Sequence, residues 1–249
     1  MGCLLGVDGL ASRAAELDLL REAGVDLRLV RLDRGPVFEN LDVLGHRRQR
    51  WLSRSDEIAV EALPDAWGRA TAWLLVPVAG EMGEPWADVP ERGARVALGP
   101  QGLLRQFADD GWVKRADLAP SGLLQAAGLV CASVGDLIPE TDLALLRQLA
   151  PGASIVLTAG DGGGIAIRDG ELERYRAIPA DRVTDPTGAG DVFLAALTAG
   201  WLLLGERATP RALRFAAAAG SCAVEGVGLG GVPKAGQVAA RLLSATRSR

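Results

Sequence analysis

Short, uninterrupted apolar runs are the feature that most constrains the fold of this chain. Residues 73–78 and 96–98 are apolar throughout, and residues 155–159 form a similar run. Such runs are typical of strands that are buried on both faces of a parallel sheet. Helical spacing of apolar residues over 10–23, 192–204, 210–224 and 235–243 predicts the helices between and after them. The sequence therefore predicts an α/β protein.

The remaining segments predict one domain with a small appendage. Residues 27–32, 165–168 and 171–178 read as further strands, the last two following tight turns. The half-polar stretch 37–52, with Gly45 near its middle, predicts a hairpin that is exposed on one face. No repeat or low-complexity linker divides the 249 residues, so residues 1–249 are expected to form a single domain.

Composition excludes several classes of function. Hydrophobic residues make up 49% and charged residues 23%, which excludes a disordered chain. A net charge of −4 leaves no basic surplus for nucleic acid. Because His46 is the only histidine, and its arginine neighbours favour a solvated turn, a multi-histidine metal site is excluded. No apolar run is long enough to span a bilayer, and three scattered cysteines fit a reducing compartment. We expect a cytoplasmic protein with a small-molecule partner, and no nucleic-acid or membrane partner.

The string DPTGAGD at residues 185–191, directly before an apolar helix, is the strongest chemical signal. Gly188, Ala189 and Gly190 can bring successive backbone N–H groups close to an anion, and the helix start adds its positive dipole end. Asp191 beside them can accept a proton from a hydroxyl, as the base of a phosphoryl-transfer enzyme does. The alternative is a glycine-rich turn that an aspartate caps.

This string resembles the signature of the ribokinase-like (PfkB) carbohydrate kinases. Residues 157–163 and 215–232 are similar to that family's nucleotide-binding segments, so the resemblance covers nearly the whole chain. Residues 78–81, 100–105 and 131–136 look like the inositol-kinase-like branch in particular. The resemblance implies a Rossmann-like three-layer α/β/α sandwich with a small β lid over residues 37–52. It also implies that such a lid can join two subunits into a homodimer.

Residue roles follow from the same resemblance. It implies that Asp191 is the general base and that Gly188, Ala189 and Gly190 form the anion hole of a kinase that uses ATP and Mg²⁺. The nucleotide would be bound by Thr158, Gly160, Gly163 and Gly228. The family's metal-binding glutamate is replaced by Asp136, which could act through magnesium-bound water or be an ordinary loop residue. Asp185 and Thr187 match positions that hold a monovalent cation such as K⁺ in many members.

The acceptor side is less well defined. Glu81 and Arg105 follow predicted strands, and we expect both to face the cleft that holds Asp191, where they would suit a neutral polyol. A surface salt bridge is the alternative. The family's usual amino-terminal strand, Gly-Gly loop and Asn-bearing helix do not precede residues 6–9, so we expect acceptor binding to be incomplete and turnover to be weak.

Two functions remain open from the sequence. The first is an ATP-dependent kinase for a hydroxyl of a sugar or cyclic polyol such as myo-inositol. The second is a catalytically impaired nucleotide-binding relative of the sugar kinases. A dinucleotide-dependent oxidoreductase is disfavoured, because no Gly-x-Gly-x-x-Gly opens a helix after the first strand.

Overall fold

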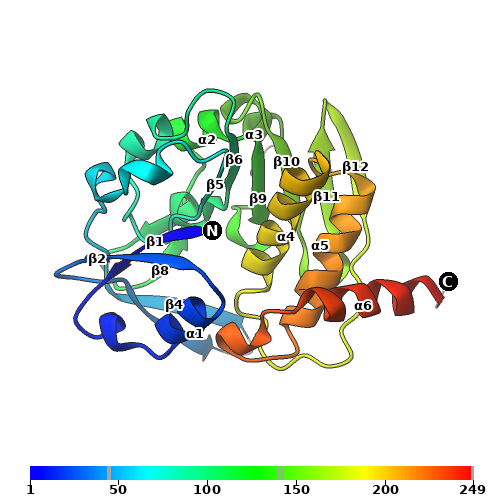
Figure 1. Ribbon diagram of the computed structural model, residues 1–249, viewed down its shortest axis with the longest axis horizontal. Helices are drawn as coiled ribbons and strands as arrows, with labels where there is room; N and C mark the ends of the chain where they lie inside the picture. The colour runs from blue at the N-terminus through cyan, green and yellow to red at the C-terminus, as the bar shows by residue number, and fades with distance from the viewer. Residues whose placement is uncertain (44–45, 140, 142, 248–249) are drawn as a thin grey trace.

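A mixed six-stranded sheet forms the centre of the molecule. The computed structural model describes residues 1–43, 46–139, 141 and 143–247. The sheet has the order β12-β11-β10-β9-β6-β5, with bounds β5 Ala72–Leu75, β6 Arg95–Leu98, β9 Leu129–Ser133, β10 Ser154–Thr158, β11 Gly164–Arg168 and β12 Glu171–Tyr175. Strands β5, β6, β9 and β10 are parallel, and β11 and β12 add an antiparallel hairpin at one edge (Figure 1).

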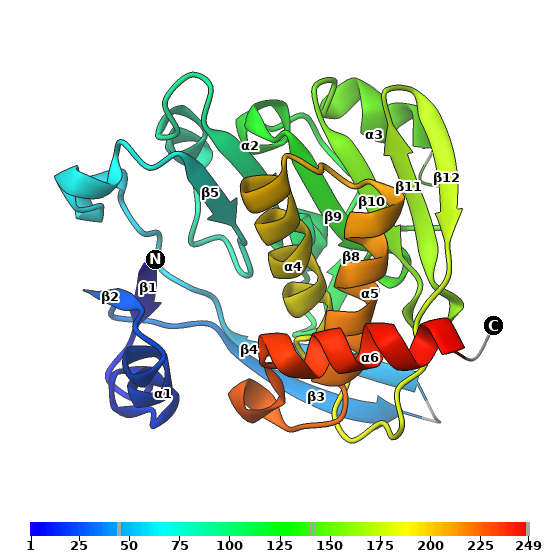
Figure 2. The same cartoon turned by 45° about the vertical axis from the view of Figure 1, so that its right-hand side comes forward.

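Helices cover both faces of this sheet, as the predicted three-layer sandwich requires. Helices α4 (Ala189–Leu204) and α5 (Pro210–Ala223) pack side by side on one face, and α6 (Ala235–Arg247) crosses the end of α5 (Figure 2). Helices α2 (Gly122–Ala126) and α3 (Leu143–Leu149) cover the other face. The expected α/β sandwich is therefore confirmed.

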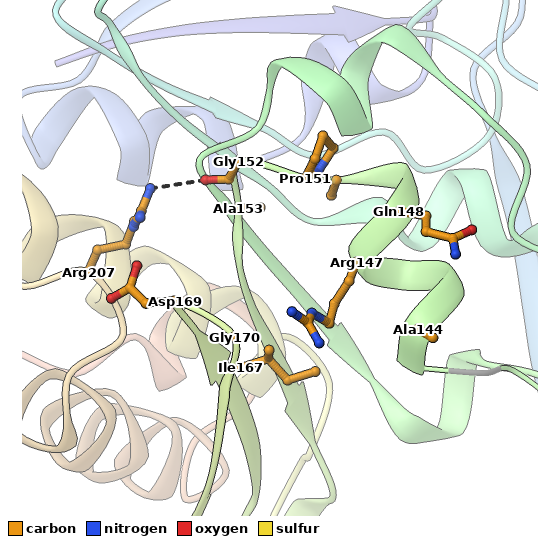
Figure 3. Close-up of a pocket in the computed structure, with 11 residues that line it drawn as sticks. Ala144, Arg147, Gln148, Pro151, Gly152, Ala153, Ile167, Asp169, Gly170 and Arg207 are labelled. Atoms are coloured by element: carbon orange, nitrogen blue, oxygen red, sulfur yellow. Dashed lines mark hydrogen bonds between the residues drawn. The ribbon is translucent and has the colours of Figure 1, made fainter.

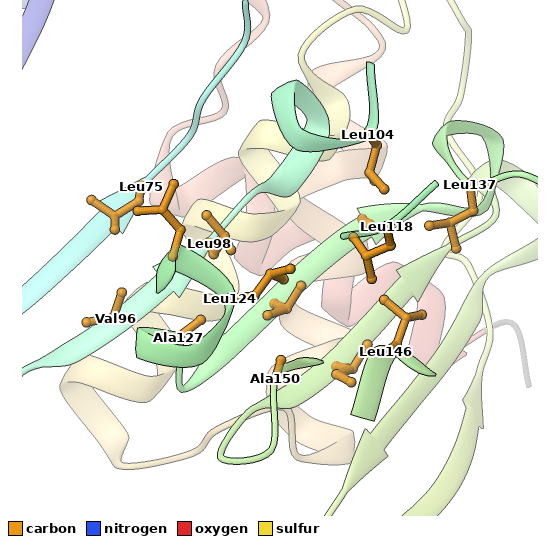
Figure 4. Packing of buried hydrophobic residues seen from close by; sticks show 14 of the residues in the cluster. Leu75, Val96, Leu98, Leu104, Leu118, Leu124, Ala127, Leu137, Leu146 and Ala150 are labelled. Atoms are coloured by element: carbon orange, nitrogen blue, oxygen red, sulfur yellow. The ribbon is translucent and has the colours of Figure 1, made fainter. Parts of the chain in front are cut away.

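The alternation of side chains along the strands explains why the apolar runs are continuous. Val130 and Ile155 belong to the larger core. Leu124 of α2 and Leu146 of α3 pack in the same core (Figure 4). The strand neighbours of Val130 and Ile155, Leu129 and Val156, point into the second core, with α4 and α5. Because both faces are buried, the inner residues of the central strands are apolar, and polar residues occur only at the strand ends.

Four strands and a helix lie outside the main sheet at the amino-terminal side. Strands β1 (Gly2–Val7) and β2 (Asp26–Arg31) form a parallel pair joined through α1 (Glu16–Glu22). Strands β3 (Val37–Val43) and β4 (His46–Ser53) form the antiparallel hairpin expected over 37–52. Gly45, predicted near its turn, lies outside the described residues. His46, predicted in a turn, is instead the first residue of β4.

A second hairpin supports the 37–53 hairpin. It consists of β7 (Arg105–Phe107) and β8 (Val113–Arg115). The indole nitrogen of Trp51 donates to the carbonyl of Ala108 at 2.9 Å, and the Phe107 ring lies edge-on to the Trp51 ring at 6.0 Å. The two hairpins are therefore joined by both hydrogen bonds and aromatic packing.

Three predicted elements are shorter than expected. The helix predicted over 10–23 begins only at Glu16, because the Asp8 carboxylate accepts the amides of Leu10 and Ala11 and holds a turn there. The strand predicted over 73–78 ends at Leu75, shortly before Pro77, which has no amide hydrogen to donate to a sheet. The strand predicted over 171–178 ends at Tyr175, where the ladder with β11 ends.

The helices of the described residues show no membrane span: none of them is both long enough and apolar enough to cross a bilayer.

Candidate functional site

Hydrogen bonds hold the start of the 184–191 loop, and its end borders open space. The amides of Thr184 and Asp185 both donate to the carbonyl of Val224, at 2.7 and 3.1 Å. The Asp185 carboxylate then accepts the amide of Thr187 at 2.9 Å. Because these bonds link the loop to the end of α5, they fix the direction in which the chain enters α4.

Two glycines lie beside open space at the start of α4. Gly188 caps the helix with φ +81°, a conformation that favours glycine. A Cβ atom built on Gly188 or on Gly190 would meet no other atom within 4 Å. Ala189, between them, donates its amide to the carbonyl of Pro186 at 3.3 Å. The first turn of α4 therefore presents amides to a space that an anion can enter.

Asp191 lies in this first turn, and two other charged side chains affect the pKa of its carboxyl group. Partial burial raises the pKa of its carboxyl group, nearby Arg105 lowers it, and the carboxylate of Asp136 raises it. The net direction is upward, which makes Asp191 a stronger base than an ordinary aspartate. The structure thus brings together three of the residues singled out from the sequence.

Arg105 and Glu81 meet at the same peptide group. Arg105 donates to the carbonyl of Val78 at 3.4 Å, and its guanidinium lies 5.2 Å from the ring centre of Phe38 in β3. The two carboxylate oxygens of Glu81 accept the amides of Val78 and Ala79, at 2.6 and 2.7 Å. Both oxygens of Glu81 are thus already bonded within its own loop, whereas Arg105 also acts on Asp191. Contact with an acceptor stays a prediction for both residues.

Asp136 follows β9 and has a neighbour that sequence reasoning did not single out. The side-chain nitrogen of Gln101 lies 3.5 Å from both carboxylate oxygens of Asp136. Ser133 turns the chain toward Asp136 by accepting the amide of Gly135 at 3.0 Å. Across the described ranges, no three Asp, Glu, His or Cys side chains gather into a metal cage. A magnesium ion at Asp136 would therefore depend on phosphate and water oxygens for its other ligands.

The segment predicted to bind nucleotide follows β10. Thr158 donates its hydroxyl to the carbonyl of Ala132 at 3.4 Å, and Gly160 has φ +58°. Gly163 has φ +83°, and a Cβ atom there would lie 2.2 Å from the carbonyl oxygen of Tyr175. Packing therefore requires glycine at 163 whether or not a nucleotide binds. Gly228, on the loop after α5, has open space beside it.

A buried thiol and phenol lie beneath Asp191. Burial, followed by the Asp191 charge, raises the pKa of the Cys131 thiol to about 12, so the thiol is protonated and neutral. The ring of Tyr175 stacks on Phe193 of α4 with a centroid distance of 5.7 Å. In this neutral form Cys131 packs as a small apolar side chain in the core with α4 and α5.

Comparison with known proteins finds similar sequences and similar folds. Residues 132–235, which include the whole 185–191 string, match the model of the pfkB family carbohydrate kinases. The chain is 30% identical over 243 residues to inositol 3-kinase of Arabidopsis thaliana, and the match covers 88% of this chain and 65% of that one. It is 34% identical over 171 residues to inositol 3-kinase of Zea mays, covering 67% and 43%. The chain thus spans less than two thirds of the length of each of these relatives.

Solved structures share the fold. One is a pyrophosphate-dependent myo-inositol-1 kinase converted into a myo-inositol-3 kinase, with a TM-score of 0.74 at 18% identity, covering 98% of this chain and 84% of that chain. Another is ribokinase of Thermotoga maritima, with a TM-score of 0.68 at 18% identity, covering 96% and 80%. At this identity the likeness establishes the fold, which is ribokinase-like. In sequence, residues 132–235 match the pfkB carbohydrate kinases, and the longer matches are to inositol 3-kinases, so the chain is similar to the inositol-kinase branch of that family.

Proposed function

We propose that the protein is an ATP-dependent kinase that phosphorylates a hydroxyl group of a sugar or cyclic polyol, with myo-inositol as the first acceptor to test. The observation that carries the proposal is the first turn of α4. There, Asp191 directly follows two glycines that border open space, and Arg105 and Asp136 act on its charge. A base and an anion site within one turn, with a cation close to them, are what phosphoryl transfer to a hydroxyl needs.

Each residue has a separate task in this proposal. The Asp191 carboxylate accepts the proton of the attacking hydroxyl, and its raised pKa strengthens it as a base. The amides of Gly188 and Gly190 donate to the oxygens of the transferred group, where negative charge accumulates, and the Ala189 amide joins them by giving up its 3.3 Å bond to Pro186. Arg105 would donate to an acceptor hydroxyl, because a guanidinium is a charged donor and this one lies close enough to act on Asp191.

The residues present fit a phosphate donor and a cation. The carboxylate of Asp136 disfavours the charge of Asp191, and a cation nearby would relieve such repulsion. Asp136 would hold the ion, and Thr158, Gly160, Gly163 and Gly228 would hold the nucleotide. When bound, Mg·ATP supplies the phosphoryl group and part of the charge that balances it. A monovalent cation near Asp185 and Thr187 would lie beside the loop that enters α4.

Turnover of the full chain with a panel of acceptors tests the proposal. ADP release and ³¹P NMR would be followed with myo-inositol, ribose, fructose and a nucleoside, with ATP and with pyrophosphate as donors. We expect phosphorylation of a polyol or sugar by ATP, and a loss of about 10²- to 10⁴-fold in Asp191→Asn with ATP affinity retained. Glu171→Gln, an exposed carboxylate on β12, is the matched control.

Two results would contradict the proposal. Unchanged turnover in Asp191→Asn would show that Asp191 is not the general base. Tight ATP binding by the native chain without phosphorylation of any acceptor would instead support the alternative, a catalytically impaired nucleotide-binding relative.

A further inference from the structure

A cavity lies at the end of the parallel strands that is opposite to Asp191. It has a volume of about 560 Å³ and is lined by the end of α3, the loop before β10 and the turn after β11, with Arg207 closing one side (Figure 3). In the parallel register Ser154 pairs with Leu129 and Thr158 with Ser133. Ser133 and Thr158 lead into the candidate active site, so the loop before Ser154 lies at the other edge. The volume is in the range of small-molecule sites.

Two arginines from different elements line this cavity. Arg147 is in the last turn of α3 and is exposed, and its side chain makes no hydrogen bond or ion pair within the described part of the chain. A Cβ atom on Gly170 would lie 3.4 Å from its Nη2, so the guanidinium lies over the 169–170 turn. Arg207 donates one N–H to the carbonyl of Gly152 at 3.2 Å, and its guanidinium stacks 5.6 Å from the ring centre of Trp201. Most of the N–H donors of this pair are therefore available to a ligand.

The third charged group of the cavity is Asp169. It has φ +51°, and with Gly170 at φ +87° it forms the tight turn between β11 and β12. Its carboxylate lies 4.0 Å from the Nε of Arg168 and is 78% exposed, so this ion pair leaves it free to accept from another donor. The helix dipole of α3 explains a cation at Arg147, but it does not explain why Arg207 and Asp169 line the same cavity.

We propose that this cavity binds a small phosphate monoester that also carries a hydroxyl group. Arg147 and Arg207 donate to the phosphate oxygens, for which the planar guanidinium group is well suited. Asp169 accepts the hydroxyl proton in a hydrogen bond, which selects such a ligand over inorganic phosphate. Two positive groups against one negative group give the cavity a preference for anions. None of these residues belongs to the site proposed for phosphoryl transfer.

Trp201 gives a local readout that does not depend on activity. The protein would be labelled with 5-fluorotryptophan, and the ¹⁹F resonance of Trp201 assigned with Trp201→Phe. Titration with glycerol 3-phosphate should shift this resonance in a saturable way, with a dissociation constant of about 1 mM or lower. Glycerol, and sodium chloride at equal ionic strength, should not shift it. Inorganic phosphate should bind more weakly than glycerol 3-phosphate.

Three variants decide the assignment. Arg147→Gln should weaken binding about 10-fold or more, because it removes a charged donor and breaks no described contact. Asp169→Asn should abolish the preference for glycerol 3-phosphate over inorganic phosphate. Asparagine can adopt the positive φ of this turn, so the turn itself should be kept. Arg211→Gln, an exposed arginine nearby that lines no part of the cavity, should bind as the native protein does. The proposal is overturned if the Trp201 resonance does not respond, or if Arg147→Gln and Arg211→Gln bind equally well.

Discussion

Replacing Arg241 with methionine should destabilise the protein substantially, although Arg241 lies near the carboxyl terminus. Its side chain in α6 is 11% exposed. One end of the guanidinium donates to Glu225 at 2.6 Å and to Asp181 at 3.2 Å. The other end donates to the carbonyl of Pro179 at 2.8 Å and to the hydroxyl of Ser221 at 2.9 Å. One side chain therefore joins α6 and α5 to the segment that leads into the 184–191 loop.

The size of the effect follows from the burial of these contacts. Removing one partner of a fully buried ion pair costs about 3–5 kcal/mol. Glu225 is 24% exposed and Asp181 is 89% exposed, so part of their charge returns to water and the loss is smaller. We expect the free energy of unfolding to fall by about 2–3 kcal/mol in Arg241→Met. For a chain of this length, that lowers Tm by about 4–12 °C.

The loss should also depend on pH. The hydrogen bond from Arg241 holds the pKa of Glu225 below its usual value of 4.5. A carboxyl group with a lowered pKa in the folded state stabilises the protein above the unfolded pKa, and that stabilisation is lost as the pH falls through the folded pKa. The difference between native protein and Arg241→Met should therefore be largest near neutral pH and narrow below about pH 4.5.

Urea unfolding followed by circular dichroism at neutral and at acidic pH measures both effects. The control is Arg211→Met, because the Arg211 side chain is 76% exposed and pairs with Glu206 at 3.2 Å; its loss should be about 0.5 kcal/mol or less. If Arg241→Met and the control lose the same stability, or if the difference does not change with pH, the reasoning about Arg241 is wrong.

Three further predictions concern the core and the candidate site. Gly128→Ala should destabilise by about 1–3 kcal/mol in thermal unfolding, because the new Cβ would lie 2.5 Å from the Trp201 ring. Gly190→Ala should leave stability equal or raise it by up to about 1 kcal/mol, since alanine favours a helix, while phosphoryl transfer falls because the methyl group occupies the open space. Asp136→Asn should move the acid limb of the kcat/KM profile to lower pH, because the neighbouring charge that raises the pKa of Asp191 is gone.

Sequence patterns located the strands of the sheet and the start of α4, because both depend on local periodicity and on residues close in the chain. The contacts around the candidate site and its supporting helices join residues that are far apart in the chain. Gln101 contacts Asp136 across 35 positions, and Arg241 contacts Asp181 across 60. No local pattern marks such pairs. Glu81 was placed at the correct strand end, but its hydrogen bonds to its own loop depend on the left-handed Gly80, φ +88°, which sequence spacing does not reveal.

The β7–β8 hairpin, which packs against the 37–53 hairpin, also carries a residue that affects the charge of Asp191. Arg105, the first residue of β7, contacts Phe38 of that hairpin and at the same time lowers the pKa of Asp191. Any swing of the joined hairpins that carries Arg105 outward removes positive charge from the base and raises its affinity for a proton. Through Arg105, the packing of the 37–53 hairpin is therefore linked to the protonation of Asp191.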